Sequence, residues 1–275
     1  MTATPTSTSS ASFTTSDDQS IAFSRYPAPA VGAPRLALVH SLALDRSVWD
    51  AVVEQLRGVA ELMTLDCRGH GRSDHRTGEY TADLFARDLA ELFDHVGWTS
   101  AAVAGCSMGG CVALAFAGRY PDRTTTLGLI DTTAWYGDGA PARFRERAAE
   151  ARSKGMAALI DFQLTRWFSE AFRASHPETI AHVMSVFLAN DLDCYASTCA
   201  LLGDADLREF LPLLRMPVAI IVGEQDHATP LAMAQQLHEQ IPQSTLDVLP
   251  DARHLTPIEC PDAVAAILRG LVTRA

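Results

Sequence analysis

Basic residues are scarce in this sequence, and their scarcity limits the partners that the protein can bind. The chain has 22 lysines and arginines against 33 aspartates and glutamates, which gives a formal net charge of −11 at pH 7. Lys154 is the only lysine, and the arginines form no run. Because an acidic surface repels phosphate backbones and anionic headgroups, we expect neither nucleic acid nor a membrane as a partner.

Long apolar runs and closely paired cysteines are also missing. No segment approaches the roughly 20 apolar residues that a membrane-spanning helix needs. The six cysteines show no C-x-x-C spacing, and several lie in apolar segments, so we expect free, buried thiols in a reducing compartment. They are Cys67, Cys106, Cys111, Cys194, Cys199 and Cys260.

The first 20 residues are mostly serine, threonine and alanine, with Phe13 as the only aromatic residue. This composition predicts a disordered tail over residues 1–20, because so few apolar side chains cannot form a core. The segment has no basic residue and no apolar run, so it does not resemble a signal or transit peptide. We therefore expect a cytoplasmic protein.

The remainder of the 275 residues alternates between short apolar runs and amphipathic segments. This alternation predicts an α/β fold with a mostly parallel central sheet and helices on both faces. The predicted strands cover residues 21–26, 35–40, 61–65, 101–104, 125–130, 218–222 and 245–249. Residues 133–211 show only helical patterns, which indicates a helical cap inserted into a core of residues 21–132 and 212–275.

The segment from Gly105 to Gly109 reads G-x-S-x-G between a buried strand and an apolar helix. This order is typical of a nucleophile elbow, a sharp turn that exposes a serine hydroxyl above the sheet. Gly105 and Gly109 are expected to remove side chains that would clash in the turn. An unreactive serine in a glycine-rich turn is the alternative, so Ser107 needs partners to count as a nucleophile.

Partners of the expected kinds follow two later strands. Asp226 comes after the strand at 218–222 and His254 after the strand at 245–249, so serine, acid and histidine occur in the order typical of such elbows. We predict that His254 transfers the Ser107 proton and that Asp226 orients the imidazole. Asp226 could instead cap the next helix, and Asp131 and Glu224 are weaker candidates for the acid.

The oxyanion formed during attack needs two N–H donors. The residue directly after the nucleophile, Met108, should supply one, and the loop after the strand at 35–40 should supply the other, which we assign to Leu42. No histidine pair has the spacing of metal ligands with carboxylates or thiols nearby, so we expect no metal site. His75, His95, His176 and His238 stand in polar surroundings and should face solvent.

Together with the motif Asp66-x-Arg68-Gly69-His70-Gly71-x-Ser73, these features resemble the α/β-hydrolase superfamily. Within it, the chain from about residue 31 to residue 269 is most similar to the 3-oxoadipate enol-lactonases. The matching stretches are His40-Ser41-Leu42, Ser107-Met108-Gly109-Gly110, Gly155-Met156-Ala157, Arg166-Trp167-Phe168, Asp204-Ala205-Asp206-Leu207-Arg208 and Gly223-Glu224-x-Asp226-x-Ala228-Thr229-Pro230. The chain departs from the family pattern at Ala43, where we expect glycine, and in its Ser/Thr-rich tail.

The resemblance implies a carboxylic ester hydrolase that opens 3-oxoadipate enol-lactone, a step of aromatic-compound catabolism, without a cofactor. The substrate would be a small, anionic lactone or ester. We expect Arg166 to bind its free carboxylate, with Arg143, Arg145, Arg147 and Arg173 as weaker rivals. Ser41, Trp135 and Trp167 are the other expected substrate-binding residues.

Two alternatives remain open from the sequence. One is a carboxylesterase or lactonase for another small ester, with the same three catalytic residues. The other is a small-molecule receptor of the same superfamily with vestigial hydrolysis, which the stretch around His40 would also suit. The oligomeric state does not follow from the sequence.

Overall fold

The computed structural model describes residues 9–27 and 30–274. Its centre is an eight-stranded sheet with the order β1-β2-β4-β3-β5-β6-β7-β8. β2 pairs antiparallel with both of its neighbours, β1 and β4, and all pairs among β3 to β8 are parallel. This arrangement confirms the predicted α/β class. The strands are β1 (Ser9–Thr14), β2 (Ser20–Tyr26), β3 (Arg35–Val39), β4 (Glu61–Leu65), β5 (Ala101–Cys106), β6 (Thr124–Ile130), β7 (Val218–Gly223) and β8 (Ser244–Leu249).

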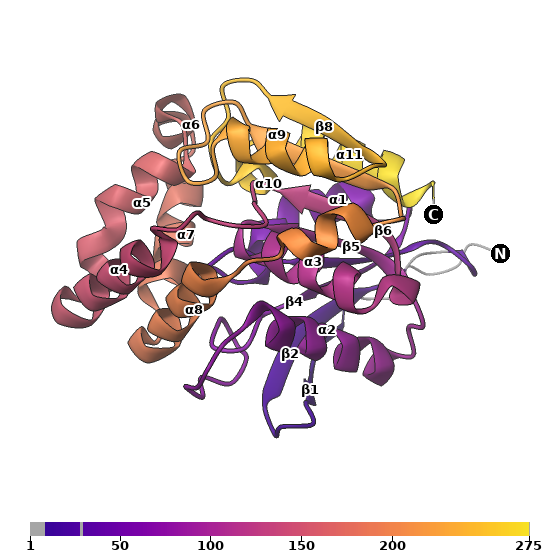
Figure 1. The fold of residues 1–275 in the computed structure, drawn as a ribbon, viewed down its shortest axis with the longest axis horizontal. Helices are drawn as coiled ribbons and strands as arrows, with labels where there is room; N and C mark the ends of the chain where they lie inside the picture. The colour runs from indigo at the N-terminus through magenta and orange to yellow at the C-terminus, as the bar shows by residue number, and fades with distance from the viewer. Residues whose placement is uncertain (1–8, 28–29, 275) are drawn as a thin grey trace.

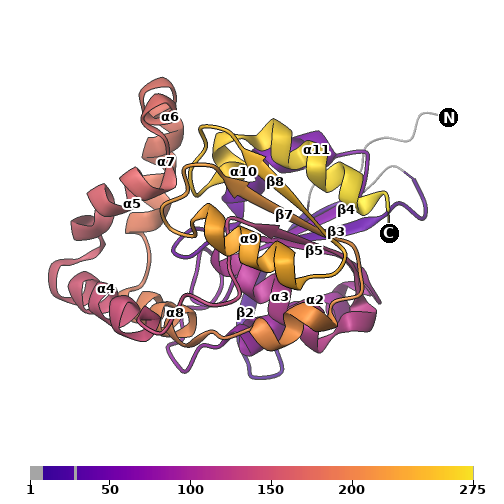
Figure 2. The ribbon, with the colours of Figure 1, turned by 45° about the horizontal axis from the view of Figure 1, so that its top comes forward.

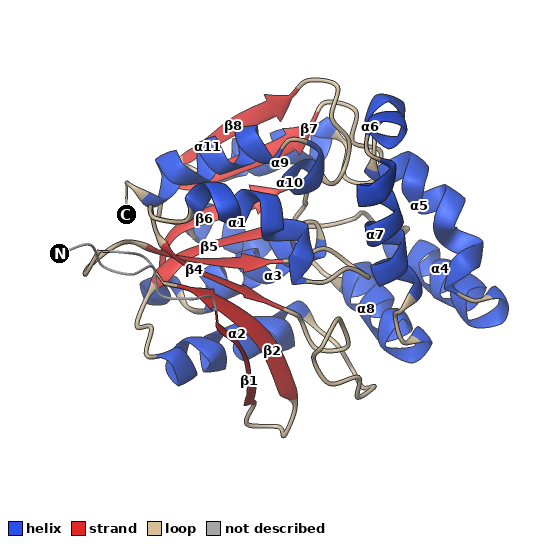
Figure 3. Ribbon diagram, turned by 180° about the vertical axis from the view of Figure 1, so that it is seen from behind, coloured by secondary structure: helices blue, strands red, loops and turns tan. Residues whose placement is uncertain are grey.

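Helices cover both faces of this sheet (Figures 1 and 3). On one face α1 (Asp50–Leu56) packs against α11 (Pro261–Val272), and on the other lie α2 (Ala82–Val96), α3 (Met108–Arg119) and α9 (Leu231–Gln240). Every residue of β5 and β7 is buried, as expected for strands with helices on both sides.

Between β6 and β7 the chain leaves the sheet and forms a block of helices, which we call the cap. Figure 2 shows the cap to one side of the sheet, beyond the carboxyl ends of the parallel strands. Loops at these ends, together with the cap, can therefore form a site. The cap helices are α4 (Ala140–Lys154), η3 (Met156–Leu159), α5 (Ile160–Trp167), α6 (Glu170–Ser175), α7 (Pro177–Leu188) and α8 (Leu192–Asp204). The remaining short helices are η1 (Arg46–Trp49), η2 (Pro121–Arg123), η4 (Arg208–Leu213) and α10 (Thr256–Glu259).

The prediction of a disordered tail over residues 1–20 is wrong for residues 9–20, and residues 1–8 lie outside the described residues. β1 pairs along its whole length with β2. Phe13 is buried, and its ring stacks on that of His95 at a centroid distance of 5.4 Å. Asp17 after the strand forms an ion pair with Arg68 at 3.0 Å. The amino-acid composition did not predict the order of residues 9–20, because this order comes from backbone pairing and ion pairs more than from buried apolar area.

The cysteines and solvent-facing histidines agree with expectation. All six cysteines are free, and only Cys260 is not fully buried. His75, His95, His176 and His238 are exposed. Across residues 9–27 and 30–274, none of the helices combines the length and apolar character needed to cross a membrane.

Candidate active site

Ser107 lies in the turn between β5 and α3, at the carboxyl edge of the sheet. Its backbone is in an unusual conformation, with φ 55° and ψ −116°. A Cβ at Gly105 would overlap the carbonyl oxygen of Gly109, and one at Gly109 would overlap the carbonyl oxygen of Val39. Both glycines are therefore required by close backbone approach, as the sequence predicted.

His254 joins Ser107 to Asp226 through two hydrogen bonds. Its Nε2 lies 2.8 Å from Ser107 Oγ, and its Nδ1 lies 2.8 Å from Asp226 Oδ2. All three side chains are nearly inaccessible to solvent. The structure thus brings Asp226 and Ser107, which lie 28 and 147 positions before His254 in the sequence, into contact with His254, as expected.

The Asp226 carboxylate is held in its charged form. Its Oδ1 accepts hydrogen bonds from the N–H groups of Ala228 and Thr229 at 2.6 and 3.0 Å. Thr229 Oγ1 donates to Oδ2 at 2.8 Å. Burial alone would raise the pKa of Asp226, but His254 and these donors hold it below its usual range. Asp226 therefore caps the following turn and also contacts His254.

The two weaker acid candidates have other partners. Asp131 is fully buried and accepts hydrogen bonds from Gly223 N at 3.1 Å and from Thr256 N and Oγ1 at 2.9 and 2.7 Å. Burial, and then the charge of Asp226, raise the pKa of the Asp131 carboxyl well above its usual value. Glu224 is exposed. Asp131 thus ties the loops after β7 and β8 together.

Both expected oxyanion donors lie beside Ser107. Met108 is the first residue of α3, so its N–H has no carbonyl partner one turn earlier in the helix. Leu42 lies in a turn closed by a hydrogen bond from Leu44 N to Ser41 O at 3.3 Å, and it lines the cavity above Ser107. Ala43 in this turn has φ 58°, so the loop keeps a left-handed residue without a glycine.

The cavity above Ser107 has a volume of about 500 Å³ and lies between the sheet edge and the cap. Of the expected substrate-binding residues, Ser41, Arg166 and Trp167 line it. The expectation for Trp135 is wrong. Its ring instead stacks under the Arg208 guanidinium at 3.9 Å, and its neighbour Tyr136 lines the cavity.

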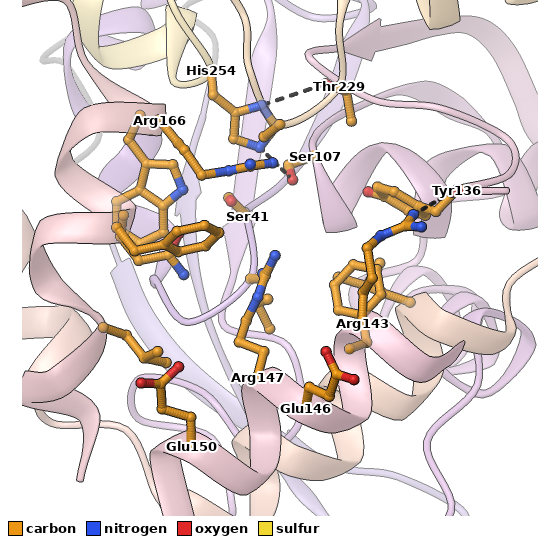
Figure 4. A pocket seen from close by; sticks show the side chains of 18 of the residues that line it. Ser41, Ser107, Tyr136, Arg143, Glu146, Arg147, Glu150, Arg166, Thr229 and His254 are labelled. Carbon is orange, nitrogen blue, oxygen red and sulfur yellow. Dashed lines mark hydrogen bonds between the residues drawn. The ribbon is translucent and has the colours of Figure 1, made fainter. Parts of the chain in front are cut away.

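Arginines from two cap helices converge on this cavity (Figure 4). Arg166 of α5 and Arg147 of α4 both lie over the Phe162 ring, at 4.9 and 5.3 Å from its centroid. Arg143 donates to the Tyr136 carbonyl at 2.8 Å. Within the described part of the chain, none of these three arginines forms an ion pair. Burial, and then the charge of Arg147, lower the pKa of Arg166.

Two residues that the sequence analysis did not single out also line the cavity. Tyr136 is buried, and Gln163 is 2% exposed with an Nε2 that has no hydrogen-bond partner among the described residues. The signal for Gln163 was its position on α5, one helical turn before Arg166 and Trp167. For Tyr136 no such signal exists, because it lies in an irregular segment.

Comparisons with known proteins identify the family of the chain. The family described as alpha/beta hydrolase fold matches residues 34–261. The 3-oxoadipate enol-lactonase 2 of Acinetobacter baylyi is 31% identical over 241 residues, covering 88% of this chain and 89% of that protein. A pimeloyl-[acyl-carrier protein] methyl ester esterase of Aromatoleum aromaticum is 30% identical, covering 87% of this chain and 98% of its own length.

Solved structures give the same picture. The crystal structure of the enol-lactonase from Burkholderia xenovorans has a TM-score of 0.91 and 31% identity, covering 96% of this chain and all (100%) of that one. A thermophilic esterase from Thermogutta terrifontis has a TM-score of 0.90 and 30% identity, covering 97% and 98%. The chain therefore belongs to the α/β-hydrolase family, in which it is similar to the enol-lactonases.

Proposed function

We propose that the protein is a serine hydrolase that opens a small anionic lactone, with 3-oxoadipate enol-lactone as the first candidate. The observation that carries the proposal is the hydrogen-bonded series Ser107–His254–Asp226 below a cavity with unpaired arginines. The similarity to enol-lactonases supports the choice of lactone. The proposal includes a role in aromatic-compound catabolism in the cytoplasm, for which free cysteines are suited.

In the proposed reaction, Ser107 Oγ attacks the lactone carbonyl while His254 Nε2 accepts its proton. Asp226 keeps the proton of the neutral imidazole on Nδ1 and stabilises the imidazolium that forms. The N–H groups of Leu42 and Met108 donate to the oxygen that becomes negative. No cofactor takes part.

Collapse of the tetrahedral intermediate breaks the ring C–O bond. The leaving oxygen departs as an enolate, which takes the proton from the His254 imidazolium and tautomerises to a ketone, so that His254 is neutral again. Because the enolate is part of the same molecule, the whole opened chain stays on Ser107 as an acyl ester. His254 then removes a proton from water, whose oxygen attacks the ester and releases the acid.

The cap supplies the proposed specificity for an anion. A carboxylate enclosed without a partner would cost several kcal/mol. Arg166 has no carboxylate partner among the described residues and points into the cavity beside His254 (Figure 4). Its planar guanidinium can bind both oxygens of a carboxylate. We infer that Arg166 binds the free carboxylate while Ser41 and Trp167 contact the ring.

The test is the loss of enol-lactone, followed in the ultraviolet, beside a panel of uncharged and anionic esters. A preference for the lactone supports the proposal, whereas a preference for another ester would favour the carboxylesterase alternative, which the related thermophilic esterase represents. A chain that hydrolyses no substrate and whose Ser107 does not react with a fluorophosphonate would instead fit a receptor.

A further inference from the structure

The turn that carries Leu42 contains one residue in an unfavourable conformation. Ala43 is the third residue of the turn from Ser41 to Leu44, and its φ is 58°. A turn with positive φ at its third position usually has glycine or asparagine there, because a Cβ is crowded in the left-handed region. Such conformations persist where the surrounding structure enforces them. Two contacts of this turn supply such support.

One support comes from the core. His40 Nε2 accepts a hydrogen bond from Cys67 N at 2.9 Å, so the ring proton is on Nδ1. His40 Nδ1 then donates to the Ser41 carbonyl oxygen at 2.7 Å. This bond fixes the first residue of the turn, but it does not reach Ala43.

The second support comes from the cap. Asn190 follows the end of α7, and its Nδ2 lies 2.7 Å from the Ala43 carbonyl oxygen. The same nitrogen lies 3.1 and 3.0 Å from the carbonyl oxygens of Val186 and Phe187 in the last turn of α7. Asn190 is therefore anchored on the helix end while its amide reaches a fully buried residue of the core.

We propose that Asn190 is a positioning residue for the oxyanion donor Leu42. Its hydrogen bond to the Ala43 carbonyl offsets the left-handed strain at Ala43 and keeps the turn in the shape that directs the Leu42 N–H at the reacting carbonyl. The cap thereby contributes to the chemical step as well as to substrate binding. The inference rests on the proposed serine hydrolase function.

The first test is Asn190→Ala, assayed with p-nitrophenyl acetate. We expect kcat to fall about ten- to a hundredfold, because small displacements of catalytic donors have effects of this size, with KM changed far less. Inhibition by a boronic acid should weaken in parallel, since its adduct with Ser107 places an oxygen beside Leu42. Asn190→Asp keeps the size of the side chain but removes the N–H donor, so it should show the same losses in kcat and in boronic acid inhibition. This variant replaces Asn190→Ala in the test if the alanine variant folds poorly.

Ser185→Ala is the matched control. Ser185 is on the same helix, and its hydroxyl donates to the His182 carbonyl at 2.7 Å, away from the turn. It should leave kcat and boronic acid inhibition unchanged. A purely structural role of Asn190 would lower the melting temperature with no change in kcat, and that result would overturn the proposal.

A second test repeats Asn190→Ala in an Ala43→Gly background. Glycine adopts the left-handed conformation without strain, so the loss in kcat should be about fivefold smaller there. An equal loss in both backgrounds would overturn the compensation of strain. Turnover by the wild-type protein with labelling of Ser107 establishes the hydrolase function separately, so failure of that function is distinguishable from failure of the Asn190 role.

Discussion

At the scale of single residues, Ser107 combines a strained backbone with a position at the base of the cavity. Its φ of 55° places it in a region that residues with a Cβ rarely adopt. Replacing the hydroxyl with hydrogen leaves this backbone unchanged, because Gly105 and Gly109 already provide the necessary space. Its reactivity can therefore be tested apart from folding.

Ser107→Ala should lower the turnover of any ester or lactone substrate by about ten-thousand-fold or more while the fold persists. The reason is that His254 then has no hydroxyl to activate. Initial rates with substrate and a thermal melt of the same sample provide the measurement. A variant with more than about a tenth of wild-type activity would show that Ser107 is not the nucleophile.

Two buried aspartates should respond differently to replacement by asparagine. Asp226→Asn should reduce kcat by about four orders of magnitude, because the asparagine amide no longer holds His254 in the required tautomer. Asp131→Asn should affect kcat less than about tenfold and act mainly on stability, because Asp131 accepts its hydrogen bonds from Gly223 and Thr256. Rates and melting temperatures of both variants separate the two roles. A larger loss of kcat for Asp131→Asn would assign the catalytic acid to that position.

At the scale of elements, α4 and α5 together supply the arginines that line the cavity. They present Arg147 and Arg166 over one phenylalanine ring, and the two like charges are tolerated without a carboxylate partner among the described residues. An anionic substrate would relieve this repulsion. The cap is thus expected to select by charge, whereas the loops of the sheet carry out the reaction.

Arg166→Ala should depress kcat/KM for the anionic lactone by at least about tenfold, because a charged hydrogen bond contributes about 1.5–3 kcal/mol. An uncharged ester such as p-nitrophenyl acetate should be hydrolysed nearly as before. Arg145→Ala is the control, since Arg145 is an exposed arginine of α4 that borders a different surface groove. Equal losses on both substrates would indicate damaged folding, and no loss on either would place the carboxylate elsewhere.

The edge strand β1 gives a prediction about stability. Phe13 is only 6% exposed and packs on His95 and Phe23. Phe13→Ala should lower the free energy of unfolding by about 3 kcal/mol, the lower end of the range for buried phenylalanines. Urea unfolding measures the change, with the exposed Ser12→Ala on the same strand as the control. Equal, small effects of the two substitutions would mean that β1 contributes little.

At the scale of the whole molecule, two histidines buried between β3 and the loop after β4 connect pH to stability. Burial, and then the neighbouring His40, lower the pKa of His70 to about 3. Burial also lowers the pKa of His40, although Asp66 opposes this shift. The rings of the two histidines lie 5.1 Å apart, so protonating both in the folded state is unfavourable.

The free energy of unfolding should therefore fall as the pH drops from about 6.5 towards 3. In this window the unfolded chain binds a proton at His70 and the folded chain does not, so acid favours unfolding by about 1.4 kcal/mol per pH unit through His70. The lowered pKa of His40 acts in the same direction. Urea unfolding at several pH values gives the slope. His70→Gln should reduce it, and the exposed His75→Gln should not. An unchanged slope in His70→Gln would contradict the assignment.

Much of this arrangement could be predicted from the sequence, because it depends on neighbouring residues. The elbow needs glycines within two positions of Ser107, and Asp226 and His254 each follow directly after a strand. The carboxyl ends of parallel strands meet at one edge of a sheet, so local patterns were sufficient to bring distant residues together. Similarity to known families then confirmed the fold.

Other features were decided only by the tertiary structure, because they depend on pairs of segments that are remote in sequence. β1 is polar and gains its order from pairing with β2, and Asp17 after the strand forms ion pairs with Arg68 and Arg87. Whether Trp135 or Tyr136 lines the cavity depends on how an irregular segment crosses the sheet edge, which no periodicity predicts. The bond from Asn190 to Ala43 joins residues 147 positions apart, and only the packing of the cap on the core places them within 2.7 Å.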